Sequence, residues 1–429
     1  MTNFKEVFKE IISEDNYLSA EENETYPRSF EIHSFKNKAI VLTGARRTGK
    51  STILAQIIKD KKNVIFINFE DERLLDALVN DLQSIIDAYI EIHPDFNENE
   101  ELHLALDEIQ NIKHWEKFID RQLRIKNRFI WITGSSAKML SKEIATTLRG
   151  RSLSYEIFPF SFLELLAIKK IPLDLTRTSK MKRQILLKDY ILESSYPEVF
   201  NTSSHVRNKI LQEYFNVMIV RDIAERHQIN SIDQIKTTLK LLFQSLGAKF
   251  SINKITEKLK ITGHSSDKET CSKIIQAAED CYLLFTLKIW AKSIHKQNVN
   301  SKKVYLVDNG LYKAIIPSKN KEEDFGHLFE NYIFLHIRRI YSDLYYITTI
   351  EGYEVDFFIP EKNWAIQVMV RAEKSETKER EVRALKSAMQ ELNLEESFLI
   401  TLEDDETLKV EEGTIHVMSA ANFILKFLS

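Results

Sequence analysis

The chain has 429 residues, more than one hydrophobic core usually organises, so about two to four domains are expected. With 43% hydrophobic residues, 29% charged residues, 10 glycines and 7 prolines, the composition favours a soluble, largely helical globular protein and argues against a β-sandwich or a disordered chain. The formal net charge of −3 excludes a globally basic nucleic-acid-binding protein, so any contact with DNA must be regional.

The cysteines and the hydropathy pattern indicate a cellular compartment. Cys271 and Cys281 form no C-x-x-C pair, which fits a reducing environment and neither a disulfide framework nor a zinc site. No apolar run approaches the ~18 to 20 residues that span a bilayer, and the first ten residues mix lysines with glutamates, unlike a signal peptide. We therefore expect a cytoplasmic protein with no membrane partner.

The first strong motif follows a lead-in of residues 1–37. G-x-x-x-x-G-K-[ST] stands between a β-like run, Ala39–Leu42, and an amphipathic segment, Thr52–Ile58. Glycines at the two ends of the motif allow a tight backbone whose N–H groups face phosphate oxygens, at the positive end of the next helix. The lysine can reach the β- and γ-phosphates, and the serine can bind Mg²⁺. The predicted nucleotide-binding residues are Gly44, Ala45, Arg46, Arg47, Thr48, Gly49, Lys50, Ser51 and Thr52.

Two acids, Asp107 and Glu108, follow another β-like run, Leu102–Leu106. Metal-assisted phosphoryl transfer needs one carboxylate for the Mg²⁺ shell and one to orient or deprotonate the attacking water. An apolar run ending in Asp-Glu is by itself more often a helix cap. The P-loop upstream favours the catalytic interpretation.

The remaining runs up to Pro159 alternate between strand and helix patterns. A strand is predicted at 63–69, a helical stretch at 70–92, and strands at 128–133 and 154–158. Ser135 follows one strand end, where it is either a γ-phosphate sensor or a loop N-cap. This alternation predicts a parallel sheet with helices on both faces.

These motifs, taken in order, resemble the prokaryotic AAA-type ATPases of the AAA+ superfamily that carry a C-terminal domain of unknown function. One departure is Ser194–Glu198, where such proteins often have paired glycines, and it puts only the flexibility of that turn in doubt. The segments that carry the resemblance are Gly-Ala-Arg-Arg-Thr-Gly-Lys-Ser from Gly44, Leu-Asp-Glu-Ile-Gln from Leu106, Ile-Thr-Gly-Ser-Ser from Ile132, Leu-Arg-Gly-Arg from Leu148, Pro-Phe-Ser-Phe-Leu-Glu from Pro159, Val220–Ile223, Lys303–Leu311, Glu330–Asn331 and Glu354–Phe357.

The resemblance implies ATP and Mg²⁺ as ligands. It implies phosphate and Mg²⁺ binding by Lys50 and Ser51, metal binding by Asp107, and activation of water by Glu108. It also implies an arginine finger at Arg149 or Arg151, since a guanidinium near the γ-phosphate stabilises the transferring group. The alternative is that both arginines are surface ion-pair partners. Because such a finger commonly acts across a subunit boundary, it would imply a homo-oligomer.

The segment 160–230 shows helical apolar spacing and is expected to form a lid over the nucleotide. Arg221–Asp222 is either a lid or interdomain pair or a plain helix-face salt bridge. In 231–310, two helices around a turn at Gly263 precede two β-like runs, which suggests a winged helix-turn-helix. The second helix mixes lysines with acids, so this unit either binds DNA or serves as an interdomain spacer.

The segment 311–429 resembles the PD-(D/E)xK nuclease fold, in which a helical Glu, a strand Asp and an E-x-K strand bind Mg²⁺. Glu330 and Asp356 fit the first two positions, but Gln367 and Met369 stand where E-x-K would fall. Gln can offer a carbonyl oxygen to a cation, whereas Met cannot assist with phosphate or water. Strand alternation places Arg371 on the same face, where it could supply a displaced charge. We expect a nuclease scaffold without its chemistry, with Glu330, Asp356 and Gln367 as the remaining candidate second metal site.

The sequence thus predicts an α/β protein with a P-loop AAA+ core, a helical lid, a winged helix and a C-terminal restriction-endonuclease-like domain. The expected function is Mg²⁺-dependent ATP hydrolysis that drives a switch or motor acting on double-stranded DNA or a protein partner. The alternatives are a nucleotide-gated metal-dependent nuclease in mobile-element or phage defence, and a nucleotide sensor that binds a partner protein. The predicted boundaries are 1–37, 38–159, 160–230, 231–310 and 311–429.

Overall fold

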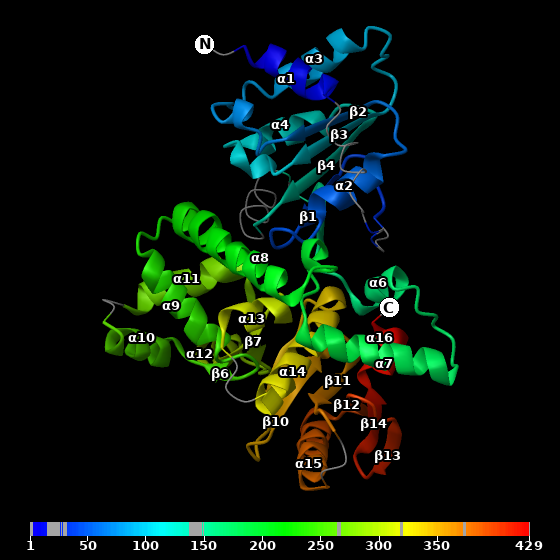
Figure 1. The fold of residues 1–429 in the computed structure, drawn as a ribbon, viewed down its shortest axis with the longest axis vertical. Helices are drawn as coiled ribbons and strands as arrows, with labels where there is room; N and C mark the ends of the chain where they lie inside the picture. Colours follow the sequence, from blue (N-terminus) through cyan, green and yellow to red (C-terminus); the bar gives the residue numbers. More distant parts are fainter. Residues whose placement is uncertain are drawn as a thin grey trace. The chain divides into compact units, whose positions relative to one another are not determined.

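A computed structural model of the full chain describes two compact units (Figure 1). The first comprises Met1–Pro159 with Asp280–Tyr282, and the second comprises Phe160–Glu279 with Leu283–Ser429. Within these units the structure describes residues 3–14, 26, 28, 32–136, 148, 150–263, 267–317, 321–371 and 375–428.

The first unit contains a five-stranded, all-parallel sheet in the order β2-β3-β4-β1-β5, as the alternating pattern predicted. The three central strands are buried along their whole length, because helices cover both faces of the sheet. The carboxyl ends of parallel strands meet at one edge, where ligands bind in open α/β sheets. The strands are β1 (Ala39–Thr43), β2 (Val64–Asn68), β3 (Leu102–Asp107), β4 (Arg128–Gly134) and β5 (Ser152–Glu156).

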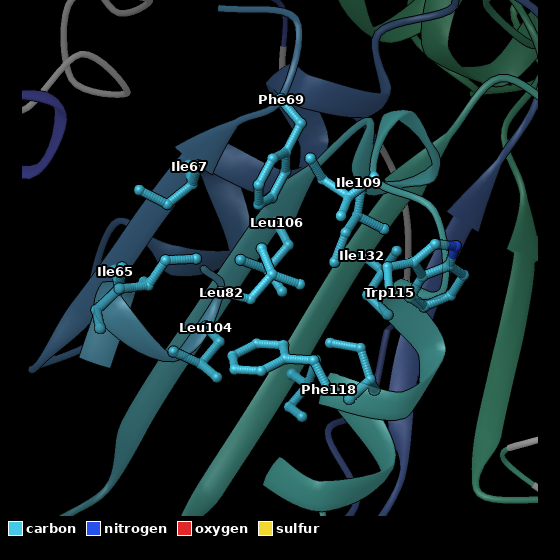
Figure 2. Close-up of a cluster of buried hydrophobic side chains, with 14 of the residues drawn as sticks. Ile65, Ile67, Phe69, Leu82, Leu104, Leu106, Ile109, Trp115, Phe118 and Ile132 are labelled. Carbon is cyan, nitrogen blue, oxygen red and sulfur yellow. The ribbon is translucent and has the colours of Figure 1, made fainter. Parts of the chain in front are cut away.

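Two hydrophobic clusters cover the two faces of this sheet. One packs α1 (Phe4–Ser13), α3 (Gln83–Ile92) and α4 (Trp115–Gln122) onto one face, and Figure 2 shows its aromatic and branched side chains meeting above β2, β3 and β4. The other packs α2 (Lys50–Ile58) against β1 and Trp131. The helix that follows the P-loop is therefore fixed against the strand that precedes it.

The predicted helical stretch at 70–92 was wrong in its first half. Only a 3₁₀ turn, Glu72–Leu74, precedes α3. The apolar spacing misled because Leu75 and Leu78 are exposed, at 82% and 64%, and so form no buried face. The Asp81 carboxylate also accepts the N–H of Leu78 at 2.9 Å, which gives the backbone an alternative to the helix.

The second unit begins with helices, as predicted for 160–230. Ser161 and Glu164 form a reciprocal capping box at the first of them. Met218–Glu225 is a π-helix, a local widening of the helix that extends from α8. The α-helices up to Asp280 are α6 (Phe162–Ile168), α7 (Arg177–Leu192), α8 (Ser204–Val217), α9 (Ile232–Phe243), α10 (Ile252–Ile261) and α11 (Lys268–Asp280).

A mixed nine-stranded sheet, in the order β13-β14-β12-β11-β10-β9-β7-β8-β6, organises the rest of this unit. β7 pairs with β9 in parallel, Lys288 opposite Tyr345, so strands from 231–310 and from 311–429 share one sheet. The strands are β6 (Lys249–Phe250), β7 (Leu284–Ile289), β8 (Lys302–Leu306), β9 (Tyr345–Thr348), β10 (Glu354–Ile359), β11 (Trp364–Val368), β12 (Glu396–Thr401), β13 (Glu406–Val410) and β14 (Gly413–Ser419).

The helices that the structure describes alongside these strands are α12 (Ile294–Val299), α13 (Asn309–Ile315), α14 (Lys321–Ile340), α15 (Ser375–Leu392) and α16 (Ala420–Phe427). β13, β14 and α16 were not predicted from the sequence. The winged-helix and endonuclease-like interpretations of these segments stay predictions. Across the described ranges, no helix is both long and apolar enough to cross a membrane.

Candidate nucleotide-binding site

The loop between β1 and α2 requires glycine at both of its motif positions. Gly44 has φ 148°, and a Cβ added there would lie 2.2 Å from the carbonyl oxygen of Ile157. Gly49 has φ 91° and is the left-handed N-cap of α2. Any larger residue at either position would strain or displace the backbone.

The Lys50 side chain folds back over its own loop. It is 4% exposed, and its Nζ donates to the carbonyl oxygens of Ala45 at 2.9 Å and Gly44 at 3.2 Å. The same nitrogen lies 3.9 Å from a carboxylate oxygen of Glu108. The cation is thus held within the loop that would surround the phosphates.

The residues predicted to bind Mg²⁺ come together at the carboxyl ends of the strands. Asp107 is 3% exposed, and its carboxylate accepts hydrogen bonds from the hydroxyls of Thr133 and Ser51. Thr133, at the end of β4, also accepts the Glu108 N–H at 3.0 Å. One threonine therefore fixes both acids.

The buried charge of the Asp107 carboxylate favours a bound cation. The pKa of Asp107 is raised to about 6, first by burial and then by the neighbouring charge of Glu108, while Thr133, Ser51 and Lys50 act in the opposite direction. A divalent cation beside Asp107 and Ser51 would offset the cost of burying the charge. The oxygen ligands present therefore fit Mg²⁺.

Glu108 has a left-handed backbone, φ 52°, which turns its side chain out of the strand pattern. Gln110 donates a hydrogen bond from its side-chain amide to the Glu108 carboxylate. Among the described residues no group bonds to the buried Oε1 of Gln110. Thr133 and Gln110 were not predicted as site residues, since each acts through a contact made only in the folded chain.

Three other predicted site residues are Ser135, Arg149 and Arg151, of which Ser135 is buried and Arg151 is partly exposed. Ser135 is fully buried, and its hydroxyl has no partner within the described segments, so it is free to bond a ligand. The side chain of Arg151 is 43% exposed and lies 3.4 Å from Asp120, the geometry of a surface ion pair. Arg149 lies outside the described residues.

Further contacts shape the loop itself. Arg46 forms an ion pair with Glu70 at 2.8 Å, and the buried Thr48 hydroxyl donates to the Ala45 carbonyl at 2.9 Å. Arg28, from the lead-in, donates to the carbonyl oxygen of Thr48 at 2.6 Å. Arg28 was not predicted as a site residue, because 20 positions separate it from its partner in the loop.

The second candidate cluster lies in the C-terminal sheet. The structure brings Glu330 and Asp356 together around Lys303, whose Nζ lies 3.0 and 2.9 Å from their oxygens. Gln367 joins them by accepting the Asp356 N–H at 3.1 Å. Met369 is 7% exposed and packs into a hydrophobic cluster with residues of α15, while Arg371 is exposed.

Two polar residues of the segments that carry the family resemblance, Asp308 and Asn331, form buried hydrogen bonds in this unit. The buried carboxylate of Asp308 accepts the N–H of Leu311 at 2.9 Å and of Ser195 at 2.7 Å. Asn331 bonds both backbone groups of Leu306, at 2.8 and 3.1 Å, and donates to Asn309 at 2.7 Å. These polar side chains tie β8 and α13 to α14.

The sheet and the P-loop site define an AAA-type P-loop ATPase domain, and the AAA domain family matches residues 36–166. The chain is 35% identical over 405 residues to the "Uncharacterized protein MJ1544" of Methanocaldococcus jannaschii, a match that covers 92% of this chain and 88% of that protein, and it belongs to the same family. An "Uncharacterized protein" of Haemophilus influenzae is 28% identical, covering 85% of this chain and 88% of that one.

Two later segments of the chain match families of unknown function. These are DUF8612 over residues 184–322 and DUF4143 over residues 325–423. A solved structure titled "The walker-type atpase paby2304 of pyrococcus abyssi" is 15% identical, covers 70% of this chain and 95% of that one, and has a TM-score of 0.43. The three family matches confirm the resemblance to AAA-type ATPases with C-terminal domains of unknown function.

Proposed function

We propose that this protein binds ATP with Mg²⁺ and hydrolyses it to drive a conformational change. One observation carries the proposal: Lys50, Ser51, Asp107 and Glu108, from two separate βα connections, meet at one edge of the sheet. Phosphoryl transfer to water requires a cation that binds the phosphates, oxygen ligands that hold the metal, and a carboxylate that activates the water, and these four residues supply all three.

Each side chain then has a separate role. The N-terminus of α2 and Lys50 bind the β- and γ-phosphates, while Ser51 and Asp107 hold Mg²⁺, which neutralises charge on the phosphates. Glu108 orients the attacking water and accepts its proton. The buried hydroxyl of Ser135, which has no partner among the residues that the structure describes, is suited to bond the γ-phosphate.

Three variants test this assignment. Lys50→Ala should abolish ATP binding, whereas Glu108→Gln should bind ATP and lose turnover by roughly 100-fold or more, since general-base catalysis contributes ~10² to 10⁴. Lys117→Ala, which removes an exposed lysine of α4, is the matched control and should leave both unchanged. Phosphate release and titration with a fluorescent ATP analogue are the measurements. Turnover at the parent rate in Glu108→Gln would remove the proposed base.

An arginine finger acting across a subunit boundary would make specific activity rise with protein concentration. Arg151 would then leave its ion pair with Asp120 to reach a neighbouring nucleotide. A specific activity that is constant with concentration, together with a monomer by light scattering in ATP, would exclude this homo-oligomer.

For the target of the ATP cycle we propose DNA, on the exposed lysines of α10. Lys254, Lys258 and Lys260 project from this helix, with Lys268 at the start of α11, whereas Lys273 is paired with Glu269 at 2.8 Å. Regional positive charge binds phosphate backbones even in an acidic protein. ATPase rates measured with and without single- and double-stranded DNA test this. An unchanged rate, with no retention of labelled DNA, would favour a protein partner.

A further inference from the structure

The ammonium group of Lys303 lies at the centre of a buried cluster of carboxylates. The side chain of Lys303 is 2% exposed, and its Nζ lies 3.0 Å from Glu330, 2.9 Å from Glu354 and 2.9 Å from Asp356. An ammonium group has three N–H donors and no acceptor. Three carboxylates at hydrogen-bonding distance therefore match its full bonding capacity.

The carboxylate oxygens of this cluster are also engaged by other donors. Tyr305 donates its hydroxyl to Glu330 at 2.7 Å, and the second oxygen of Asp356 accepts the Val368 N–H at 3.0 Å. Lys249 reaches the second oxygen of Glu354 at 2.6 Å. Both oxygens of Glu354 and of Asp356, and the Glu330 oxygen that Lys303 contacts, thus already hold hydrogen bonds or ion pairs.

The third predicted ligand is engaged on both ends of its amide. The Gln367 oxygen accepts the Asp356 N–H at 3.1 Å, and its nitrogen donates to Glu381 at 2.6 Å. The Gln367 amide therefore joins the strands β10 and β11 to α15.

A divalent cation among these oxygens would need ligand distances of about 2.0 to 2.6 Å. It would then lie within a few ångströms of the Lys303 ammonium, in surroundings from which water is largely excluded. Two cations at that separation repel strongly, and the lysine cannot leave without abandoning a buried position. The residues predicted as a second metal site therefore do not fit a metal while Lys303 is in place.

We propose that the Lys303 ammonium is the resident cation of this cluster, in the position that a divalent ion would otherwise take. Lys303 lies on β8, whereas its partners lie on α14 and β10, so the cluster joins two strands of the nine-stranded sheet to one helix. Its role is then to fix the sheet, and the C-terminal unit binds partners without a metal centre at this place.

The first test is metal binding by the full chain without nucleotide. Mn²⁺ titrations followed by electron paramagnetic resonance should give the same number of bound ions for the parent and for Asp356→Asn. Loss of one Mn²⁺ site in Asp356→Asn, with Lys303 intact, would overturn the proposal.

The second test is thermal stability. Lys303→Met keeps the aliphatic chain but removes the cation from Glu330 and Asp356 and leaves Glu354 with Lys249, and it should lower Tm by about 10 °C. Lys302→Met, at the neighbouring lysine on the same strand, is the control and should change Tm by less than about 2 °C. Adding Asp356→Asn to Lys303→Met should recover part of the loss, because it removes one uncompensated charge.

An unchanged Tm in Lys303→Met, or a double variant less stable than the sum of its singles, would overturn the proposal. If Lys303→Met does not fold, the Mn²⁺ comparison of the parent with Asp356→Asn decides alone.

Discussion

Thr133 is the residue on which the geometry of both acids depends, and Thr133→Val tests it. The substitution preserves shape but removes the hydroxyl that donates to Asp107 and accepts the Glu108 N–H. Thr133 is fully buried, so water cannot replace the lost bonds. We expect Asp107 and Glu108 to lose their fixed positions while the P-loop stays intact.

The size of the effect follows from the two bonds. A hydrogen bond to an ionised carboxylate contributes about 1.5 to 3 kcal/mol, and the bond to the Glu108 N–H contributes about 1 kcal/mol. If the stronger bond is needed in the transition state, its loss slows turnover by about 10- to 100-fold. Loss of both should lower the free energy of unfolding by about 2 to 4 kcal/mol.

Phosphate release, urea unfolding and affinity for a fluorescent ATP analogue separate these effects. Thr133→Val should keep nucleotide affinity within a few-fold of the parent. Thr133→Ser restores the hydroxyl and should recover most of the activity. The reasoning fails if Thr133→Ser is as defective as Thr133→Val, or if Thr133→Val turns over ATP at the parent rate.

Two further predictions use other positions. Gly44→Ala should abolish nucleotide binding, because its Cβ would lie 2.2 Å from the Ile157 carbonyl oxygen. Gly326→Ala, in open space on α14, is the control and should leave nucleotide binding unchanged. A titration with a fluorescent ATP analogue that found equal affinities for the two variants would contradict this. Burial raises the pKa of Glu330 from its ordinary 4.5 to about 7, so the folded state holds that proton more tightly and stability from this group falls as pH rises from about 4.5 to about 7. Glu330→Gln should therefore become more stable relative to the parent as the pH rises from about 4.5 to about 8 in urea unfolding, and a difference in unfolding free energy that stays constant with pH would refute the assignment.

The ATPase core was predictable because its signals are local. A β-like run, a glycine motif and a helix fixed the region around Gly44, and a second apolar run placed Asp107 and Glu108 at the same edge of a parallel sheet. The contacts of Thr133 and Gln110 were not predictable, since a strand threonine and a glutamine are common and only the fold brings them to the acids. The helical pattern through Leu75 and Leu78 failed because apolar spacing does not show which side chains become buried.

The C-terminal unit was harder to predict because its pairings are long-range. β13 has charged, largely exposed side chains and pairs only with β14 at the sheet edge, so it lacks the apolar run that marks a central strand. Lys303 was part of a segment that carries the family resemblance, but no role was predicted for it. Its partners lie 27 to 53 positions away, and no sequence spacing predicts that one lysine neutralises three acids.

The resting position of Lys50 has a consequence for how quickly and how tightly a nucleotide is captured. Its ammonium is already out of bulk water and oriented by the Gly44 and Ala45 carbonyls, so binding exchanges these acceptors for phosphate oxygens and requires neither dehydration of a free cation nor a search among rotamers. The conformational entropy lost on association should accordingly come mainly from the nucleotide.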